Sequence, residues 1–440
     1  MSCPYKAIYE KAGYDVSSCA ECAAVNKECK QSAEGVAKEL ASKSSKSPSV
    51  VIDDAVGSAT KKASVIFGKV TKEYDVIEDP IPHFIIETDT HVRGWYQDKA
   101  AVKPRTCTSE YFLMTPYRGC NMCTFCYLPG MRGYYSSGYL SVDLGYPDQV
   151  KRDLEQLNIA FPAYFSPFCE AFNELEPIYH NAEKAARVCN DFNVPIMFTT
   201  KKRVPDWAWD VLAQNKYSSL QVSINTSDNA IWRTIAPGAE DVDILRSNLA
   251  KDKEKGVYAL LRVDPILPFI TTESAIFELV DSVKHHVDHV VFGFAEFGYA
   301  MKKKVFARYE QLFGGGVFEE FSNIYNTTLG GNYVPDTQFR FDFFNKVSQF
   351  MQDIGVTMST CSEWYEGEDG NLKALCEYNT SKSCHGIPVP VHYKADDGRF
   401  YPLDKCYGAC LNCPSNACGN QTLHQATALE YPVLKKLTVE

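Results

Sequence analysis

The chain has 440 residues, a formal net charge of −10, and 45% apolar residues. This length predicts two or three domains, and the composition supports a sizeable core, which excludes a mostly disordered chain. The negative charge disfavours purely charge-driven binding of nucleic acid, although it leaves room for a local basic groove. No apolar run approaches the ~20 residues of a membrane span, and the N-terminus lacks the apolar part of a secretory signal. We therefore expect a cytoplasmic protein without membrane contact.

Cysteine is the unusual residue type. The chain has 17 cysteines, an odd number, gathered near the N-terminus (Cys3–Cys29), in a tight trio (Cys120–Cys126) and near the C-terminus (Cys361–Cys418). Without a secretory signal, a disulfide framework is the poorer interpretation of such clusters. Clustered reduced thiols indicate metal or iron–sulfur ligation instead.

The chain begins with an extension over residues 1–90, in which a helical stretch near residues 34–42 leads into a Ser/Lys-rich linker, Lys43–Ser49. Beyond it, strand-like and helix-like segments alternate. The predicted strands are Tyr111–Thr115, Ala163–Phe165, Pro195–Thr199, Leu220–Ile224, Tyr258–Val263, His289–Phe294 and Val356–Ser359. The predicted helices are Asp148–Leu157, Leu175–Phe192, Asp206–Gln214, Val242–Lys255, Thr272–His285 and Phe341–Ile354. Repeated βα units indicate an α/β fold, a parallel sheet or barrel with its chemistry at the carboxyl ends of the strands.

The cysteine trio, Cys120, Cys123 and Cys126, follows directly on the first predicted strand of this region. Three thiolates on one short loop can hold three corners of a [4Fe–4S] cube, which leaves the fourth iron open to a small molecule. A zinc site is the alternative, but zinc prefers four ligands, and no fourth cysteine or histidine lies within ten residues. The trio therefore predicts an iron–sulfur centre.

Several segments, taken in order, resemble the radical S-adenosylmethionine (SAM) enzymes, and among them the spore photoproduct lyase branch. They are Cys126–Leu128, Ser166–Glu170, Leu175–Pro177, Phe198–Lys201, Val222–Asn225 and Arg262–Pro265. The resemblance covers roughly Tyr111 to Ser359 and implies a partial (βα)6-type barrel, assigned to residues 91–360. It also implies reductive cleavage of SAM at a [4Fe–4S] cluster and hydrogen abstraction by the resulting 5′-deoxyadenosyl radical. A reductant such as flavodoxin or ferredoxin would supply the electron.

The trio departs from the usual spacing of that family, which has three residues between its first two cysteines. Here there are two, and the usual first position falls on Gly119. The segment Cys406–Cys413 has the family spacing, but only 27 residues follow it, too few for the remaining βα units. We therefore expect the SAM site at the trio.

The resemblance also implies contacts to SAM from residues near the strand ends. Tyr127 would lie against the adenine, and Ser166, Glu170, Lys201, Ser223 and Asn225 would contact the amino acid or ribose parts. Arg262 and Asp264 would face SAM or substrate. Each has a plainer interpretation: a solvated basic patch at Lys201–Arg203, local backbone bonds for Ser223 and Asn225, and a structural ion pair between Arg262 and Asp264.

Cys169 lies where spore photoproduct lyase carries a cysteine that returns hydrogen to a product radical. The resemblance therefore implies a catalytic role for Cys169, since a thiol S–H bond is weak enough to donate a hydrogen atom. The alternative is a small buried apolar residue at a strand end.

The C-terminal region, residues 361–440, carries Cys406, Cys410, Cys413 and Cys418, four thiols within thirteen residues. Such a group predicts a metal centre, either a second [4Fe–4S] cluster or a structural zinc ion. The N-terminal cysteines, Cys3, Cys19, Cys22 and Cys29, are either metal ligands or free thiols.

These features predict a radical SAM enzyme of the lyase or rearrangement type, acting on a nucleic-acid base or modified nucleotide. A second hypothesis is modification of an amino acid or peptide with the help of an auxiliary cluster. A third, from another class, is a non-catalytic zinc- or cluster-binding interaction protein, which would leave the βα units after the trio unexplained.

Overall fold

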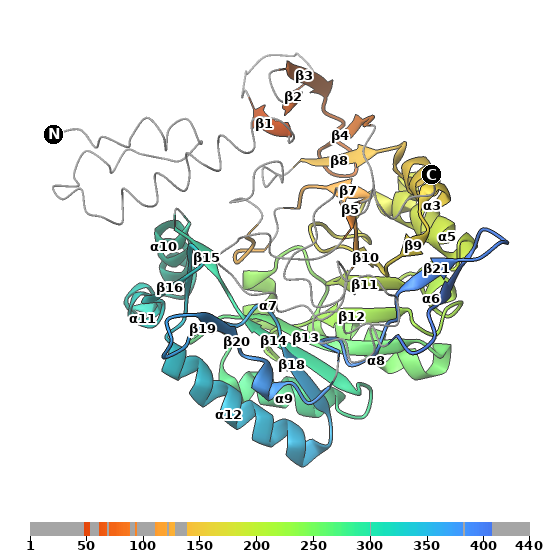
Figure 1. Ribbon diagram of the computed structural model, residues 1–440. Helices are drawn as coiled ribbons and strands as arrows, with labels where there is room; N and C mark the ends of the chain where they lie inside the picture. The colour runs from red at the N-terminus through yellow and green to blue at the C-terminus, as the bar shows by residue number, and fades with distance from the viewer. Residues whose placement is uncertain are drawn as a thin grey trace.

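The computed structural model describes residues 48–52, 61–67, 70–88, 93–94, 111–120, 123–127, 139–299, 301–381 and 383–406. Its centre is a curved sheet with helices on the outer side (Figure 1). The remaining strands form small sheets at the two ends of the barrel and beside its first strand.

The main sheet has the strand order β18-β14-β13-β12-β11-β10-β6-β5. Within the described residues, all neighbours pair in parallel except β5 and β6, which are antiparallel. The strands are β5 Arg93–Gly94, β6 Phe112–Met114, β10 Ala163–Phe165, β11 Ile196–Thr200, β12 Ser219–Ser223, β13 Tyr258–Ile266, β14 His289–Phe294 and β18 Thr357–Thr360. No strand pairing joins β18 to β6 in the part of the chain described, so the barrel is partial.

The helices on the outer side of the sheet bury one face against it. In α9, Ile276, Leu279, Val280 and Val283 are buried, a spacing that places all four on one side of a helix. The helices are α3 Tyr146–Gln156, α4 Glu176–Tyr179, α5 Asn181–Asp191, α6 Asp206–Leu212, α7 Asn229–Ile235, α8 Val242–Lys255, α9 Glu273–Val283, α10 Lys302–Phe313, α11 Val317–Ile324 and α12 Thr337–Ile354.

The partial α/β barrel expected from the sequence is confirmed, with a parallel strand in each of the seven predicted places. One predicted helix, Leu175–Phe192, is divided into α4 and α5, because His180 between them takes a left-handed conformation (φ +52°). Elements near the carboxyl end of β14 were not predicted: β15 Phe297–Gly298, β16 Thr327–Leu329 and β17 Asn332–Val334, which form a small sheet.

The residues before the barrel form two small sheets. Strands β1 Pro48–Ile52, β2 Lys62–Phe67 and β3 Val70–Asp75 are antiparallel, and β4 His83–Ile86, β8 Leu140–Asp143 and β7 Tyr117–Arg118 make the second sheet. The predicted helical stretch at residues 34–42 lies outside the described residues, and the domain boundaries at 90 and 360 stay predictions.

The chain after β18 returns along the barrel and crosses its amino-terminal end. A hairpin, β19 Trp364–Glu366 with β20 Leu372–Ala374, leads to the short helix η3 Cys376–Tyr378. Strand β21 His392–Lys394 then pairs with both β22 Phe400–Pro402 and β9 Ile159–Ala160. Because β9 lies just before β10, this sheet covers the amino-terminal end of the barrel, opposite β15 and β16 (Figure 1).

The segment 383–386 closes that end between β18 and β6. The Cys384 carbonyl accepts a hydrogen bond from Ser359 Oγ (2.5 Å), and His385 Nδ1 lies 2.8 Å from the Tyr111 hydroxyl, just before β6. Gly386 (φ +75°) has no room for a side chain, since an added Cβ would lie 2.2 Å from Tyr258 Oη. Within the described ranges, none of the helices has both the length and the apolar character needed to cross a membrane.

Candidate active site at the carboxyl ends of the barrel strands

The trio loop, residues 119–127, leaves the sheet directly after β7. Gly119 takes a left-handed conformation (φ +88°), which turns the chain toward Cys120. Cys126 N donates to Cys123 O (3.2 Å), and Thr124 N donates to the Ile235 carbonyl at the end of α7 (2.8 Å). The structure thus fixes the loop to the barrel by backbone bonds and leaves its thiols partly exposed and unbridged.

The three thiols of the trio influence one another electrostatically. Burial raises the pKa of Cys123 to about 12, and the neighbouring Cys120 and Cys126 also raise it, whereas the Lys201 ammonium lowers it. A metal must displace such protons when it binds. Among the described residues, no set of three Cys, His, Asp or Glu side chains has the arrangement of a single metal-ion site.

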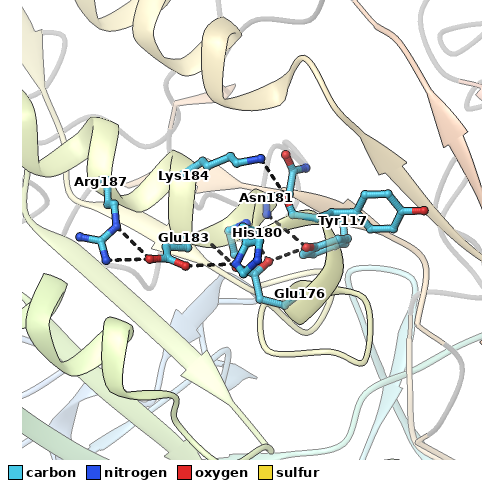
Figure 2. A network of polar contacts seen from close by, with 9 residues as sticks. Tyr117, Glu176, His180, Asn181, Glu183, Lys184 and Arg187 are labelled. Atoms are coloured by element: carbon cyan, nitrogen blue, oxygen red, sulfur yellow. Dashed lines mark hydrogen bonds and ion pairs between the residues drawn. The ribbon is translucent and has the colours of Figure 1, made fainter. Parts of the chain in front are cut away.

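A buried network holds β7 in place just ahead of the trio (Figure 2). The Tyr117 hydroxyl donates to Glu176 Oε2 (2.5 Å) and accepts from Asn181 N (3.3 Å). Glu176 also accepts from the backbone N–H groups of Ala182 and Glu183 (both 2.9 Å). One carboxylate therefore caps the start of α5 and anchors the strand that carries the trio.

Two predicted SAM contacts lie in the turn after β10. Ser166 is left-handed (φ +71°), and its Oγ accepts from Ala171 N (2.9 Å), so it shapes the turn. Glu170 accepts hydrogen bonds from Thr200 Oγ1 (2.8 Å) and Lys201 N (3.0 Å). The Glu170 carboxylate therefore ties this turn to the end of β11, although burial still raises its pKa.

Lys201 and Tyr127 join the trio loop to neighbouring strands. Lys201 Nζ lies 5.9 Å from the centre of the Phe125 ring, inside the loop, so this partly exposed lysine lies beside the trio loop. Tyr127 donates its hydroxyl to the Pro167 carbonyl (3.0 Å) in the turn after β10.

Polar side chains from β12 and β13 point into the barrel near the carboxyl ends of its strands. Ser223 pairs in register with Arg262, and residues paired in parallel strands face the same side. Arg262 contacts Gln221 Oε1 (3.4 Å), forms an ion pair with Asp264, and donates to Cys361 Sγ (2.9 Å). The predicted Arg262–Asp264 pair thus exists, at the end of the barrel that carries the trio.

We name the group Ser223, Asn225, Arg262, Asp264 and Cys361 the C-terminal mouth. Asn225 Nδ2 donates to the Pro265 carbonyl (2.5 Å), but within the described residues Asn225 Oδ1 and Ser223 Oγ are buried without a hydrogen-bond partner. Unpartnered buried oxygens are costly, and a bound polar molecule would satisfy them.

Cys169 is half-buried and lies in the turn after β10. It packs against the main hydrophobic core, makes a hydrogen bond with the backbone of Tyr117, and lies near Cys120. Its catalytic role stays a prediction.

The predicted C-terminal metal centre lies largely outside the described residues, which include Cys406 but not Cys410, Cys413 or Cys418. Cys406 Sγ accepts from Val391 N (3.3 Å), next to β21, and so lies at the amino-terminal end of the barrel. Cys361 and Cys384 belong to the barrel interior instead. The N-terminal cysteines also lie outside the described ranges.

The sequence did not indicate Tyr117 and Glu176 as parts of the site, and it grouped Cys361 with the C-terminal cysteines. Cys361 could have been found, because it lies two residues beyond the predicted strand Val356–Ser359, at the end of the barrel where such folds carry their chemistry. The Tyr117–Glu176 bond joins residues 59 positions apart and leaves no local signal.

The residues present fit an iron–sulfur cluster and a polar ligand beside it. Three thiols occupy one loop at the carboxyl edge of a parallel sheet, and unpartnered polar oxygens lie at the neighbouring strand ends.

Comparisons with known proteins extend this picture. No protein-family model matches the chain. A protein of Pseudomonas phage M6 named "Radical SAM Nalpha-GlyT isomerase" is 30% identical over 380 residues, which cover 81% of this chain and 79% of the phage protein.

Among solved structures, spore photoproduct lyase complexed with dinucleoside spore photoproduct has a TM-score of 0.48 at 15% identity, over 63% of this chain and 82% of that one. Streptococcus suis SuiB bound to precursor peptide SuiA has a TM-score of 0.40 at 13% identity, over 57% of this chain and 48% of SuiB. The assignment rests on the phage relative, which matches most of both chains. This chain therefore belongs to the radical SAM enzymes, a family that uses a [4Fe–4S] cluster and S-adenosylmethionine.

Proposed function

We propose that this protein is a radical SAM isomerase that acts on a nucleic-acid base or modified nucleotide. The observation that carries the proposal is the long match to the phage isomerase, whose name specifies both the reaction class and Nα-GlyT. An isomerase leaves the composition of its substrate unchanged, so every hydrogen removed from the substrate must be matched by one returned to the product.

We assign the cluster to Cys120, Cys123 and Cys126. When bound, the cluster and SAM would supply a 5′-deoxyadenosyl radical that abstracts hydrogen from the substrate. The position of the trio supports this assignment, since the loop lies at the carboxyl ends of the strands and Lys201 faces it.

We assign SAM to the space bordered by the trio loop and the C-terminal mouth. Tyr127, Lys201, Ser223, Asn225 and Arg262 face this region, and the unpartnered oxygens of Ser223 and Asn225 provide acceptors for a polar ligand. Ser166 and Glu170 contribute to SAM binding indirectly, because their side chains fix the turns that position Tyr127 and Lys201.

The mouth also orients the substrate and excludes water. Arg262 is 9% exposed and is held by Asp264, so its guanidinium presents a fixed charge to a bound molecule. A charge fixed in advance costs no reorganisation during the reaction.

The C-terminal cysteines Cys406, Cys410, Cys413 and Cys418 would hold a second [4Fe–4S] cluster or a structural zinc ion. Four closely spaced thiols support either choice. We propose that a one-electron reductant of the flavodoxin or ferredoxin class serves the trio cluster.

The test is anaerobic reconstitution followed by incubation with SAM, dithionite and Nα-GlyT. We expect 5′-deoxyadenosine and a new compound of the same mass as Nα-GlyT but a different retention time. Cys123→Ala should abolish both, whereas Cys189→Ala, a buried cysteine on α5, should abolish neither.

Cleavage of SAM with Nα-GlyT unchanged would reject this substrate, and the absence of cleavage in wild type would reject radical initiation at the trio.

Iron near eight atoms per chain would indicate a second cluster in the C-terminal region, and about four iron atoms with one zinc would indicate a structural site.

A further inference from the structure

Cys361 lies directly after β18, at a place in the barrel that the proposed function has not yet used. Its sulfur accepts a hydrogen bond from Arg262 Nη2 (2.9 Å), and Arg262 is paired with Asp264. The side chain is half-buried and not part of a disulfide. A thiol, a guanidinium and a carboxylate therefore meet at the carboxyl ends of β13 and β18.

Strand register and the contact with Arg262 together place this thiol toward the barrel interior. Arg262 pairs with Val291, and Val291 with Ser359, so these three residues form one inward-facing layer. The register shifts on β13 after Val263, so contacts define the next group toward the mouth: Asp264 and Cys361 both lie against Gly293, and Arg262 donates to Cys361 Sγ.

Gly293 leaves this group without a side chain between its neighbours. A Cβ at Gly293 would lie 2.9 Å from the Cys361 carbonyl oxygen and 3.1 Å from Asp264 Cγ. Only glycine allows the end of β18 to approach β13 so closely, and this approach brings the Cys361 thiol to Arg262.

A second, independent observation indicates that a ligand binds beside this thiol. Ser223 is 1% exposed and Asn225 is fully buried, and both lie at the end of β12, next to β13. Ser223 Oγ and Asn225 Oδ1 have no hydrogen-bond partner among the described residues. Two orphaned polar atoms next to Arg262 are satisfied if a polar molecule occupies the mouth.

The thiol lies on the same side of the barrel as the trio. Tyr127, which belongs to the trio loop, interacts electrostatically with Tyr164, Asp264 and Arg262. Tyr164 in turn interacts with Cys361. A molecule bound between the trio loop and Arg262 would therefore contact the side chain of Cys361.

The sulfur retains its hydrogen at neutral pH. Burial raises the pKa of the Cys361 thiol to about 11, although Arg262 opposes the rise. The bond from Arg262 uses a lone pair of the sulfur, which leaves the S–H hydrogen available to another acceptor.

We propose that Cys361 is the residue that returns a hydrogen atom to the rearranged product radical. This inference rests on the proposed isomerase function. The Cys361 S–H bond breaks, a C–H bond forms on the product, and a thiyl radical remains on Cys361. One electron from the flavodoxin- or ferredoxin-class reductant, or from dithionite in vitro, and one proton from water then restore the thiol.

Cys169 is the competing donor, and its surroundings differ. Its sulfur bonds with the Tyr117 backbone, packs against the main core and lies near Cys120 of the trio. No described contact joins Cys169 to the unpartnered oxygens of Ser223 and Asn225, whereas Arg262 lies beside Ser223 in register and touches Cys361.

The first test measures deuterium in the product. The holoenzyme reacts with SAM, dithionite and Nα-GlyT in D2O, where thiol hydrogens exchange with solvent. Wild type should place one deuterium on carbon in the isomer. Cys361→Ser nearly keeps the size of the side chain but replaces the weak S–H bond with a strong O–H bond. We expect this variant to form about tenfold less labelled product, while 5′-deoxyadenosine still forms. Cys376→Ser on η3 is the matched control and should behave as wild type.

Labelling that persists in both Cys361→Ser and Cys361→Ala would overturn the proposal. Loss of labelling in Cys169→Ser alone would assign the role to Cys169. An unlabelled wild-type isomer would mean that hydrogen returns from 5′-deoxyadenosine, and no cysteine would then be needed.

The second test needs no turnover and remains decisive if Nα-GlyT is not the substrate. Cluster-loaded protein is alkylated with iodoacetamide with and without S-adenosylhomocysteine, and peptides are mapped by mass spectrometry. We expect S-adenosylhomocysteine to slow alkylation of Cys361 about tenfold and to leave Cys376 unchanged. Equal Cys361 rates with and without this ligand, or labelling only after denaturation, would show that the thiol does not face the site.

Discussion

At the scale of single residues, the site depends on Gly293 as much as on the side chains that carry chemistry. The positions of Arg262, Asp264 and Cys361 all follow from the close approach of β13 and β18 at this glycine. Protein interiors are close-packed, so an added methyl group there must displace backbone.

Gly293→Ala should therefore lower the free energy of unfolding by about 1–3 kcal/mol and weaken binding of S-adenosylhomocysteine. The measurements are urea unfolding and calorimetric titration. Gly298→Ala is the control, because an added Cβ there would meet only Asn332 Oδ1 at an ordinary 3.9 Å. Equal stability of Gly293→Ala and wild type would contradict this account of the mouth.

The sequence was informative about residues that act locally. It predicted the trio loop and the polar residues at the ends of β11, β12 and β13, because polar side chains stand out after buried strands. It did not predict that Glu170 binds the Lys201 backbone or that Arg262 reaches Cys361, since these contacts join residues 31 and 99 positions apart.

At the scale of elements, β7 and α5 are joined by the Tyr117–Glu176 bond. Glu176 begins α4 in the sequence, yet its carboxylate caps α5 and accepts the Tyr117 hydroxyl. The predicted single helix Leu175–Phe192 was wrong for this reason, because a tertiary contact stabilises the break at His180. Helix periodicity cannot reveal a cap supplied from the preceding helix.

Tyr117→Phe removes the hydroxyl from this network and leaves the Asn181 N–H without its acceptor. We expect a loss of about 1–3 kcal/mol in the free energy of unfolding and less iron bound after reconstitution, since the trio loop begins at β7. Urea unfolding and iron analysis measure the two effects.

Arg187→Ala is the control for the same network (Figure 2). Arg187 forms an exposed ion pair with Glu183 on α5, and such pairs contribute about 0–1 kcal/mol. An equal loss of stability in the two variants would argue against a special role for the buried bond.

At the scale of the whole molecule, the chain after β18 closes the barrel that its strands leave open. His289 lies at the start of β14. Its Nδ1 is 2.8 Å from Thr357 Oγ1 and its Nε2 is 3.2 Å from the Cys384 carbonyl oxygen, so this side chain joins β14, β18 and the segment 383–386. Burial lowers the pKa of His289 to about 4 from its usual 6.5.

This histidine should make the fold sensitive to acid. Between pH 6.5 and 4 the unfolded chain binds a proton at His289 that the folded chain does not, so the free energy of unfolding falls as the pH falls. The shift corresponds to roughly 3 kcal/mol across that window.

Urea unfolding between pH 4 and 7 measures the effect. His289→Gln should flatten the dependence only in part, because buried His392 also has its pKa lowered to about 4. A full slope retained in His289→Gln would contradict the assignment.

The closed amino-terminal end also restricts how substrates can reach the site. Within the described residues, Cys384 and His385 lie across the amino-terminal end of the barrel, so we expect a substrate to approach from the carboxyl end, where the trio lies. For the nucleotide substrate proposed above, a base inside a duplex would have to swing out of its stack to reach Arg262 and Cys361, whereas a free nucleotide or a strand end could enter directly. Single-stranded and unpaired substrates should therefore have an advantage set by the topology of the fold, independent of any recognition of their sequence.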